Sequence, residues 1–132
     1  LARLIRVDQL HIGTVVGKLQ GSLKEVSEIN QEIEKKTVKE TQNRLQQDWK
    51  KIKSTLSVSS GGLHPGHVPF LIKHLGKDLV LQFGGGIHGH PKGTLRGAIA
   101  ARQATQATMQ NISLKQYSKD HLELKEALEY WK

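Results

Sequence analysis

The chain has 132 residues, a formal net charge of +8, no cysteine and 36% hydrophobic residues, with a mean hydropathy of −0.46. Its length allows one domain or a piece of a larger one. The lack of cysteine excludes disulfides and thiolate metal sites, and no apolar stretch reaches the roughly 20 residues of a membrane span. We therefore expect a cytoplasmic protein without membrane partners. A chain that begins with Leu1 indicates a trimmed protein or a fragment.

The positive charge does not identify a partner, because a basic surface can bind nucleic acids, bind phosphorylated substrates or simply be solvated by water. In residues 24–53 the lysines are mixed with glutamates such as Glu25 and Glu28, whose carboxylates would repel a phosphate backbone. Two Phe and two Tyr offer few surfaces on which bases could stack. We expect no nucleic-acid partner.

The first unit of the chain is an apolar run at residues 4–11, which predicts a β-strand and is followed by a glycine-rich turn. Ser22 and Glu25 then have the spacing of a capping box at the start of a helix. Apolar residues follow at helical spacing: Leu23, Val26, Ile29 and Ile33. A second amphipathic stretch carries Leu45, Trp49 and Ile52.

Two further strands are predicted at residues 55–59 and 78–83, and each ends in a glycine cluster. A short helix over residues 68–75 follows the second strand and should stop at Gly76. An alanine-rich helix follows the third strand, from about Thr94 to Gln110. A last helix should begin near Ser113, with an anchoring face formed by Leu124, Leu128 and Trp131.

Strands that alternate with helices predict an α/β fold with a parallel sheet. Three strands cannot bury both faces of such a sheet, and a complete TIM (β/α)8 barrel needs about 250 residues. The sequence therefore predicts a partial barrel over residues 1–111, followed by a C-terminal helical extension over residues 112–132.

The two glycine clusters are candidate phosphate sites. Residues 60–62 (SGG) and 84–86 (GGG) each follow a predicted strand, where α/β barrels place their functional loops. Glycines there let several backbone N–H groups point at one anion. Each cluster taken singly is equally compatible with a plain tight turn.

The turn after the first strand ends in Gly17 and Lys18, and we interpret it as a mobile loop whose lysine closes over a substrate and stabilises negative charge. It is not a P-loop, because leucine follows Gly17-Lys18. A solvated surface lysine is the alternative. His11 at the strand end could donate to a phosphate oxygen, although a lone histidine is more often packed.

Four histidines lie near the glycine clusters: His64, His67, His88 and His90. Their spacing lacks the H-E-x-x-H pattern and a nearby orienting carboxylate, so we expect hydrogen bonds that fix the loops rather than a metal site. The carboxylates nearest the strands, Asp8 and Asp78, lie within or before a strand, so no general base and no metal ligands are evident.

Three motifs resemble the large subunit of ribulose-bisphosphate carboxylase/oxygenase (RuBisCO). Residues 11–19 (HIGTVVGKL) resemble its sixth strand and mobile loop, residues 60–66 (SGGLHPG) the end of the seventh strand, and residues 81–91 (LQFGGGIHGHP) the eighth. Residues 65–66 and the tail 117–131 are most similar to the archaeal form III enzymes. Gln9 departs from the histidine of many members.

The resemblance implies that the chain is the last three β/α units of the barrel of a lyase that fixes CO2 and also acts as an oxygenase. Lys18 would stabilise the carboxylated transition state. The residues implied to bind ribulose 1,5-bisphosphate are His11, Ser60, Gly61, Gly62, Gln82, Phe83, Gly84 and Gly85. The Mg2+ ligands would lie upstream, in the remainder of a homo-oligomeric large subunit, so the segment alone should be inactive.

Two alternatives stay open at this point. A RuBisCO-like protein would enolise or isomerise a related sugar phosphate, although the intact loop with Lys18 favours a carboxylase. A non-catalytic module would bind sugar phosphates or only assemble with a partner. We also expect the isolated segment to expose apolar sheet edge and to self-associate.

Overall fold

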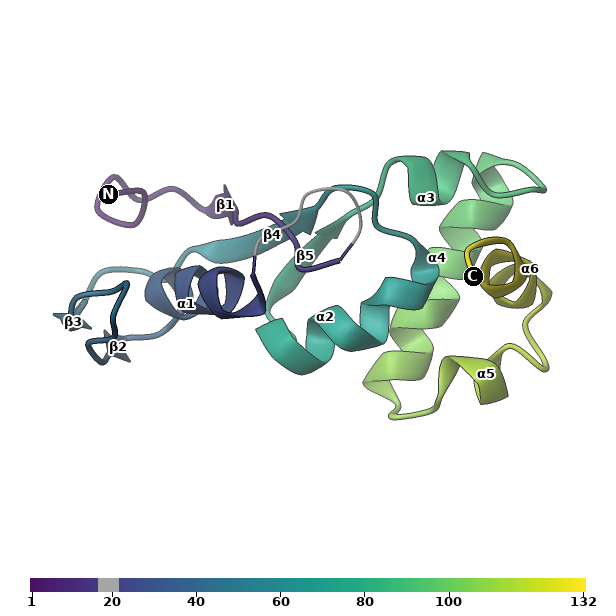
Figure 1. The fold of residues 1–132 in the computed structure, drawn as a ribbon. Helices are drawn as coiled ribbons and strands as arrows, with labels where there is room; N and C mark the ends of the chain where they lie inside the picture. The colour runs from purple at the N-terminus through teal and green to yellow at the C-terminus, as the bar shows by residue number, and fades with distance from the viewer. Residues whose placement is uncertain (17–21) are drawn as a thin grey trace.

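The computed structural model describes residues 1–16 and 22–132, and its centre is a three-stranded parallel sheet (Figure 1). The strands are β1 (Gln9–His11), β4 (Leu56–Ser60) and β5 (Leu79–Gln82), in the order β1-β4-β5. Both pairings are parallel, as the alternation of strands and helices predicted. The α/β class and the parallel sheet are therefore confirmed.

Two helices cover one face of this sheet. They are α1 (Leu23–Glu34) and α2 (Val68–Leu75). The strand residues that pack towards them belong to one alternate set, because successive side chains of a strand point to opposite faces. The core cluster between the layers consists of Ile12, Val26, Ile33, Leu63, Leu71 and Leu75. No described helix covers the opposite face, which we call the open face; Leu56 on it is 41% exposed, although Val58 is buried.

The rest of the chain forms a helical layer beyond β5. Its elements are the 3-10 turn η1 (Pro65–His67), α3 (Gly85–His88), α4 (Thr94–Met109), α5 (Leu114–Tyr117) and α6 (Leu122–Tyr130). The side of α4 that faces its neighbours is lined by small residues, which allow close packing: Gly97, Ala100, Ala101, Ala104 and Ala107. Ala104, Val68 and Leu124 form the core of this second layer.

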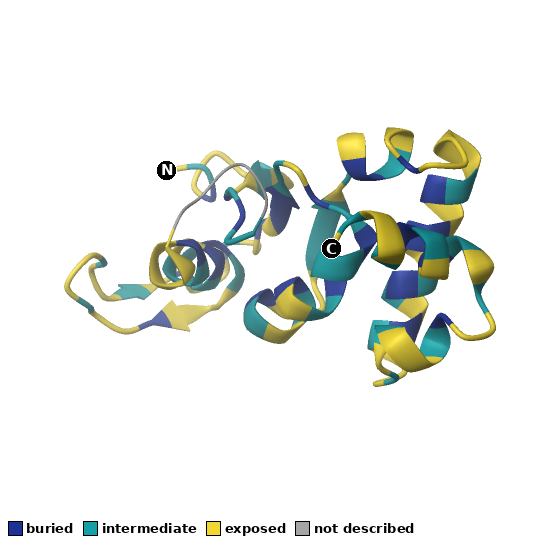
Figure 2. Ribbon diagram, turned by 45° about the vertical axis from the view of Figure 1, so that its right-hand side comes forward, coloured by how far each residue is buried: buried dark blue, intermediate teal, exposed yellow. Residues whose placement is uncertain are grey.

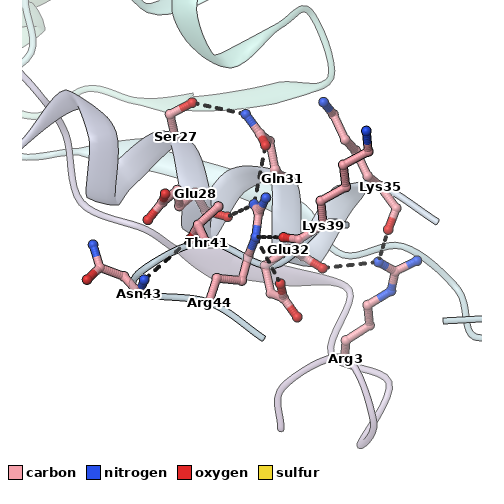
Figure 3. Close-up of polar contacts among 10 residues, drawn as sticks. All are labelled: Arg3, Ser27, Glu28, Gln31, Glu32, Lys35, Lys39, Thr41, Asn43 and Arg44. Carbon is pink, nitrogen blue, oxygen red and sulfur yellow. Dashed lines mark hydrogen bonds and ion pairs between the residues drawn. The ribbon is translucent and has the colours of Figure 1, made fainter. Parts of the chain in front are cut away.

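A small antiparallel hairpin of β2 (Thr37–Val38) and β3 (Gln47–Asp48) extends from the far end of α1, opposite α6 (Figure 1). Figure 2 shows that most of its residues are exposed. Arg44 holds the hairpin to α1 by donating to the Glu28 carbonyl at 3.4 Å and the Gln31 side chain at 3.2 Å (Figure 3). Nearby, Arg3 donates to the Lys35 carbonyl at 2.6 Å.

This hairpin differs from the amphipathic stretch that the sequence indicated at residues 45–52. Trp49 is buried, but Leu45 is 80% exposed, so the three apolar residues do not share one helical face. Strand pairing and a turn replace a helix here, and Trp49 N donates to the Lys36 carbonyl at 2.9 Å. The guanidinium of Arg3 lies 4.9 Å from the centroid of the Trp49 ring. The spacing of these three apolar residues was misleading, because tertiary contacts bury only some of their side chains.

Most predicted helix bounds are confirmed: α2 spans Val68–Leu75 and α4 spans Thr94–Met109, against predictions of 68–75 and about 94–110. The capping box is present, with Glu25 N donating to Ser22 Oγ and Ser22 N to the Glu25 carboxylate, both at 3.2 Å. α2 ends at Gly76, as predicted. The single helix expected from Ser113 is wrong, since a turn over residues 118–121 separates α5 from α6. The first strand is also shorter than the apolar run at residues 4–11.

Candidate functional site

The carboxyl ends of the three strands bring the predicted site residues to one edge of the sheet. His11 is in register with Val58, and Ser60 is in register with Gln82. Because Val58 and Ser60 are two residues apart on β4, all four side chains belong to the open face. His11, Ser60 and Gln82 therefore lie at the C-terminal ends of their strands, on the face that α1 and α2 do not cover.

His11 and Ser60 are in direct contact across β1 and β4, through a hydrogen bond between Nε2 and Oγ. The other ring nitrogen, Nδ1, accepts from the backbone N–H of Gly13 at 3.2 Å. In a neutral ring the proton is then on Nε2, and His11 donates to Ser60. Since Ser60 Oγ accepts that bond, its own hydroxyl proton is free to be donated to a ligand. The arrangement presents a hydroxyl donor to the open face.

The turn after Ser60 requires its two glycines. Gly61 has φ +115° and Gly62 has φ +73°, in the left-handed region that side-chain-bearing residues avoid. The 3-10 turn η1 that follows is capped by two histidine rings. His64 Nδ1 accepts from Gly66 N at 3.2 Å, and His67 Nδ1 accepts from His64 N at 3.3 Å. These bonds hold the backbone directly after the two glycines.

The second cluster, Gly84–Gly86, differs because its glycines have different surroundings. A Cβ added at Gly84 or Gly85 would meet no atom within 4 Å, so nothing in the described part of the chain requires glycine there. A Cβ at Gly86 would lie 1.9 Å from the carbonyl oxygen of Leu63. Gly86 thus lets α3 press against the first glycine loop, while Gly84 and Gly85 keep their outer side open for an approaching group.

The neighbouring histidines take part in hydrogen bonds, as the sequence led us to expect. His88 Nδ1 bonds Thr94 Oγ1 at 3.2 Å, and His90 Nε2 bonds the carbonyl of Glu123 at 3.1 Å. Burial and the nearby His67 lower the pKa of His64 to about 4. Burial also lowers the pKa of His67. Both rings are therefore neutral at pH 7, which agrees with their roles as acceptors from backbone N–H groups.

The proposed loop lysine cannot be placed, because Lys18 lies outside the described residues. The described residues before it continue from β1. Ile12 N donates to the Val58 carbonyl at 3.0 Å, Thr14 is fully buried, and its Oγ1 accepts from Val16 N at 3.3 Å. The chain therefore leaves the sheet beside His11 and Ser60.

The described carboxylates do not form a metal site beside these loops. Asp8 comes before β1 and is paired with Lys53 at 2.8 Å, and Asp78 comes before β5. Within residues 1–16 and 22–132, no group of three or more His, Asp or Glu side chains is arranged to hold an ion. The chemistry of this edge is that of neutral donors: a hydroxyl, an imidazole and backbone N–H groups.

One cluster beside the site was not expected from the sequence. Trp131, predicted only as part of an anchoring face, stacks on His64 with ring centroids 5.6 Å apart and an interplanar angle of 8°. The ring of His67 lies 3.6 Å from that of His64 on another side. Nothing in the spacing of residues 64 and 131 indicates this contact, because 67 positions separate them.

Comparison with known proteins identifies the family. The family model described as "Ribulose bisphosphate carboxylase large chain, catalytic domain" matches residues 1–131. The chain belongs to this family. The ribulose bisphosphate carboxylase of Methanosarcina mazei is 50% identical over 133 residues, covering 99% of this chain and 31% of the relative. That of Methanocaldococcus jannaschii is 52% identical over 132 residues, covering 98% and 31%.

Solved structures agree with this RuBisCO assignment. An archaeal RuBisCO crystal structure superposes with a TM-score of 0.87 at 43% identity, covering 98% of this chain and 31% of that chain. The dimeric archaeal RuBisCO of Hyperthermus butylicus gives a TM-score of 0.86 at 40% identity, with the same coverage of 98% and 31%. An octameric RuBisCO from Pyrococcus horikoshii gives 0.81 at 41% identity, covering 98% and 28%. The chain thus spans about a third of the length of these relatives.

The described helices give one further negative result. Among residues 1–16 and 22–132, no helix is both long enough and apolar enough to cross a membrane.

Proposed function

We propose that the chain is the part of ribulose-1,5-bisphosphate carboxylase/oxygenase that supplies the substrate's phosphate-binding loops and the loop lysine for CO2 fixation. The observation that carries this proposal is the bond between His11 and Ser60, beside the turn of Gly61 and Gly62. This bond leaves the hydroxyl proton of Ser60 free, so that this hydroxyl and the N–H groups of the loop are hydrogen-bond donors on the open face. Such a set is suited to the oxygens of a phosphate monoester.

The architecture that we propose for the whole protein is a (β/α)8 barrel in which β1, β4 and β5 are strands six to eight. Residues 1–111 would be the last three β/α units, and residues 112–132 a helical extension. The proposal is supported by an open sheet face and by outer edges of β1 and β5 that pair with no other described strand. In a closed barrel, the earlier strands would pair with these two edges and enclose the open face. The site residues would then line its C-terminal mouth.

Each residue has a stated part in binding the bisphosphate. His11 and Ser60 hold one phosphate by side-chain hydrogen bonds. The N–H groups of Gly62, Gly84 and Gly85 hold the other, with the side of Gly84 and Gly85 that is open in the described structure facing it. Gly61, Gln82 and Phe83 line the same pocket. Fixed donors at two separate phosphates would orient the substrate between them.

The chemical step needs groups beyond these loops. Lys18 would stabilise the charge that develops when CO2 adds to the substrate's enediolate. The residues present do not fit Mg2+, so the metal of the parent enzyme would be held by residues upstream of this chain. We further propose that the parent is a homo-oligomer, as the dimeric and octameric archaeal relatives are. O2 would compete with CO2 at the same carbon.

The test is fixation of 14CO2 with ribulose bisphosphate and Mg2+, on this chain and on a protein in which it is joined to the upstream part found in its relatives. We expect fixation only by the longer protein. Lys18→Ala should abolish it. Lys24→Ala, an exposed lysine at the start of α1, is the matched control and should retain it.

Two outcomes would move the assignment elsewhere. A folded longer protein that exchanges the substrate's C3 proton with solvent but fixes no CO2 would be an enolase-like member of the family. A folded longer protein that neither exchanges the proton nor fixes CO2 but still binds the bisphosphate would be a non-catalytic sugar-phosphate-binding module. Fixation that survives Lys18→Ala would contradict the role given to that lysine.

A further inference from the structure

Trp131 lies beside the segments that follow both glycine clusters. Its indole stacks on His64, whose ring caps η1 directly after the turn of Gly61 and Gly62. On the second loop, a Cβ built at Gly89 would lie 3.7 Å from Trp131 Cζ2, and the ring of His90 is centred 6.3 Å from the indole. One aromatic side chain from the end of the chain therefore lies between the parts of the two loops that are far from the strands.

The helix α6, which leads into Trp131, is held against α4 by hydrogen bonds. At the start of α6, the Glu123 carboxylate accepts from Arg96 at 3.1 Å and from Gln103 at 2.9 Å, and Gln103 in turn accepts from Leu124 N at 2.9 Å. The carbonyl of Glu123 is bonded to His90. Leu124 is fully buried against α4. With its first turn held on α4, α6 ends at Tyr130 and leads into Trp131, whose N–H donates to the Ala127 carbonyl at 3.0 Å.

The two loops also touch each other directly. Gly86 packs on the carbonyl of Leu63, so the spacing between the loops is fixed near the sheet by this backbone contact. Beyond this contact, the Trp131 ring lies next to His64 of the first segment and beside Gly89 and His90 of the second. Gly62, Gly84 and Gly85 come one or two positions before the Leu63–Gly86 contact, on its strand side, and their N–H groups would have to converge on one anion.

We propose that Trp131 is a positioning residue for the phosphate site, which sets the spacing and orientation of the two glycine-rich loops through its stack on His64 and its place beside Gly89 and His90. It touches no substrate. The link to phosphate rests on the function proposed above, whereas the effect on the loops does not.

The experiment compares three variants of the longer protein: Trp131→Ala, Trp131→Phe and Trp49→Ala. Trp49 is the other tryptophan of the chain, is buried, and directly follows β3, which lies at the opposite end of the molecule from α6 (Figure 1). It therefore controls for the general cost of removing an indole. Phe keeps an aromatic face that can stack on His64.

The first readout, hydrogen–deuterium exchange, needs no substrate. In peptides covering residues 61–67 and 84–90, we expect Trp131→Ala to speed exchange about tenfold, which corresponds to about 1.4 kcal/mol of lost local stability. Trp131→Phe should restore most of the protection, and Trp49→Ala should leave both peptides unchanged. Unchanged exchange in Trp131→Ala, or equal acceleration by Trp49→Ala, would overturn the inference.

The second readout is the dissociation constant of ribulose bisphosphate, measured by calorimetry. It should rise about tenfold in Trp131→Ala and recover in Trp131→Phe, because a small misplacement of fixed donors weakens every bond to the anion. Faster exchange of both loops in a protein that binds no bisphosphate would support the positioning of the loops and refute the proposed function. Faster exchange with unchanged affinity would refute the role of Trp131 at the phosphate site.

Discussion

The two glycine-rich loops contain the same residue type for different physical reasons. In the loop after β4, Gly61 and Gly62 have positive φ, so the backbone itself requires glycine. In the loop after β5, Gly86 is required by packing on Leu63, whereas Gly84 and Gly85 have neither a positive φ nor a described atom within 4 Å of an added Cβ. Glycine is thus explained by backbone conformation in the first loop and by close packing at Gly86, while at Gly84 and Gly85 it leaves space beside the backbone. Each explanation can be tested by a single added methyl group.

The largest effect should come from Gly86→Ala. The new Cβ would meet backbone atoms of Leu63 and His64, at 1.9 and 2.7 Å, which cannot rotate away as a side chain would. We expect the free energy of unfolding to fall by about 3 kcal/mol or more, as in severe overpacking. Urea unfolding followed by circular dichroism measures this. A loss below 1 kcal/mol would show that α3 moves away from the first loop without cost, and the packing explanation would be wrong.

A smaller loss is expected for Gly62→Ala. At φ +73° an added Cβ strains the backbone, which costs about 1–2 kcal/mol. The same unfolding experiment applies, and Gly62→Asn is the control, because asparagine tolerates this region better than alanine. Equal losses for the two variants would argue against conformational strain as the reason for glycine at this position.

The pH dependence of stability tests whether the neutral ring of His64 stabilises the first loop. The pKa of His64 is about 4 in the folded chain, against about 6.5 in an unfolded one. The unfolded state therefore binds the proton more readily, so this contribution to stability is complete above pH 6.5 and is lost as the pH falls towards 4.

Thermal unfolding midpoints measured between pH 7 and pH 4 would show this loss. In His64→Asn the side chain can still accept from Gly66 N but does not titrate, so its midpoint should fall less over the same range. An identical pH profile for the two proteins would place the titrating group elsewhere, with His67, whose pKa is also lowered by burial, as the next one to replace.

The smallest effect on stability should follow Gly85→Ala. No atom of residues 1–16 or 22–132 lies within 4 Å of the added Cβ, so the free energy of unfolding of the isolated 132-residue chain should change by no more than about 0.5 kcal/mol. In the longer protein, the affinity for ribulose bisphosphate should still fall, because the methyl group occupies the side from which the phosphate would approach. Unchanged affinity would remove Gly85 from the proposed site.

Prediction from the sequence succeeded where the signal is local. The strands predicted at residues 55–59 and 78–83 are found within one residue, at Leu56–Ser60 and Leu79–Gln82. They, the capping box of Ser22 and the stop at Gly76 each depend on residues within a few positions of one another. The length of the last helix was wrong because His121 stacks on Tyr117 and bonds its carbonyl, which forms a turn where apolar spacing alone continues.

The candidate site could be predicted only in part. The sequence placed His11, Ser60 and the glycines at strand ends, and the resemblance to RuBisCO gave them roles that remain predictions. It did not reveal that His11 donates to Ser60, because that bond depends on the register of two strands 49 residues apart. Nor did it separate Gly86 from Gly84 and Gly85, since the difference depends on what faces each glycine.

By itself, the sequence determined the class of fold, the family and the residues at the ends of the strands, because periodicity, turn chemistry and extended motifs are written in consecutive positions. Only the tertiary structure decided which of these residues meet. It brought Trp131 onto His64 across 67 positions and Gly86 onto Leu63 across 23. The physical reason is that such contacts arise from the packing of whole helices against a sheet, which no short segment encodes alone.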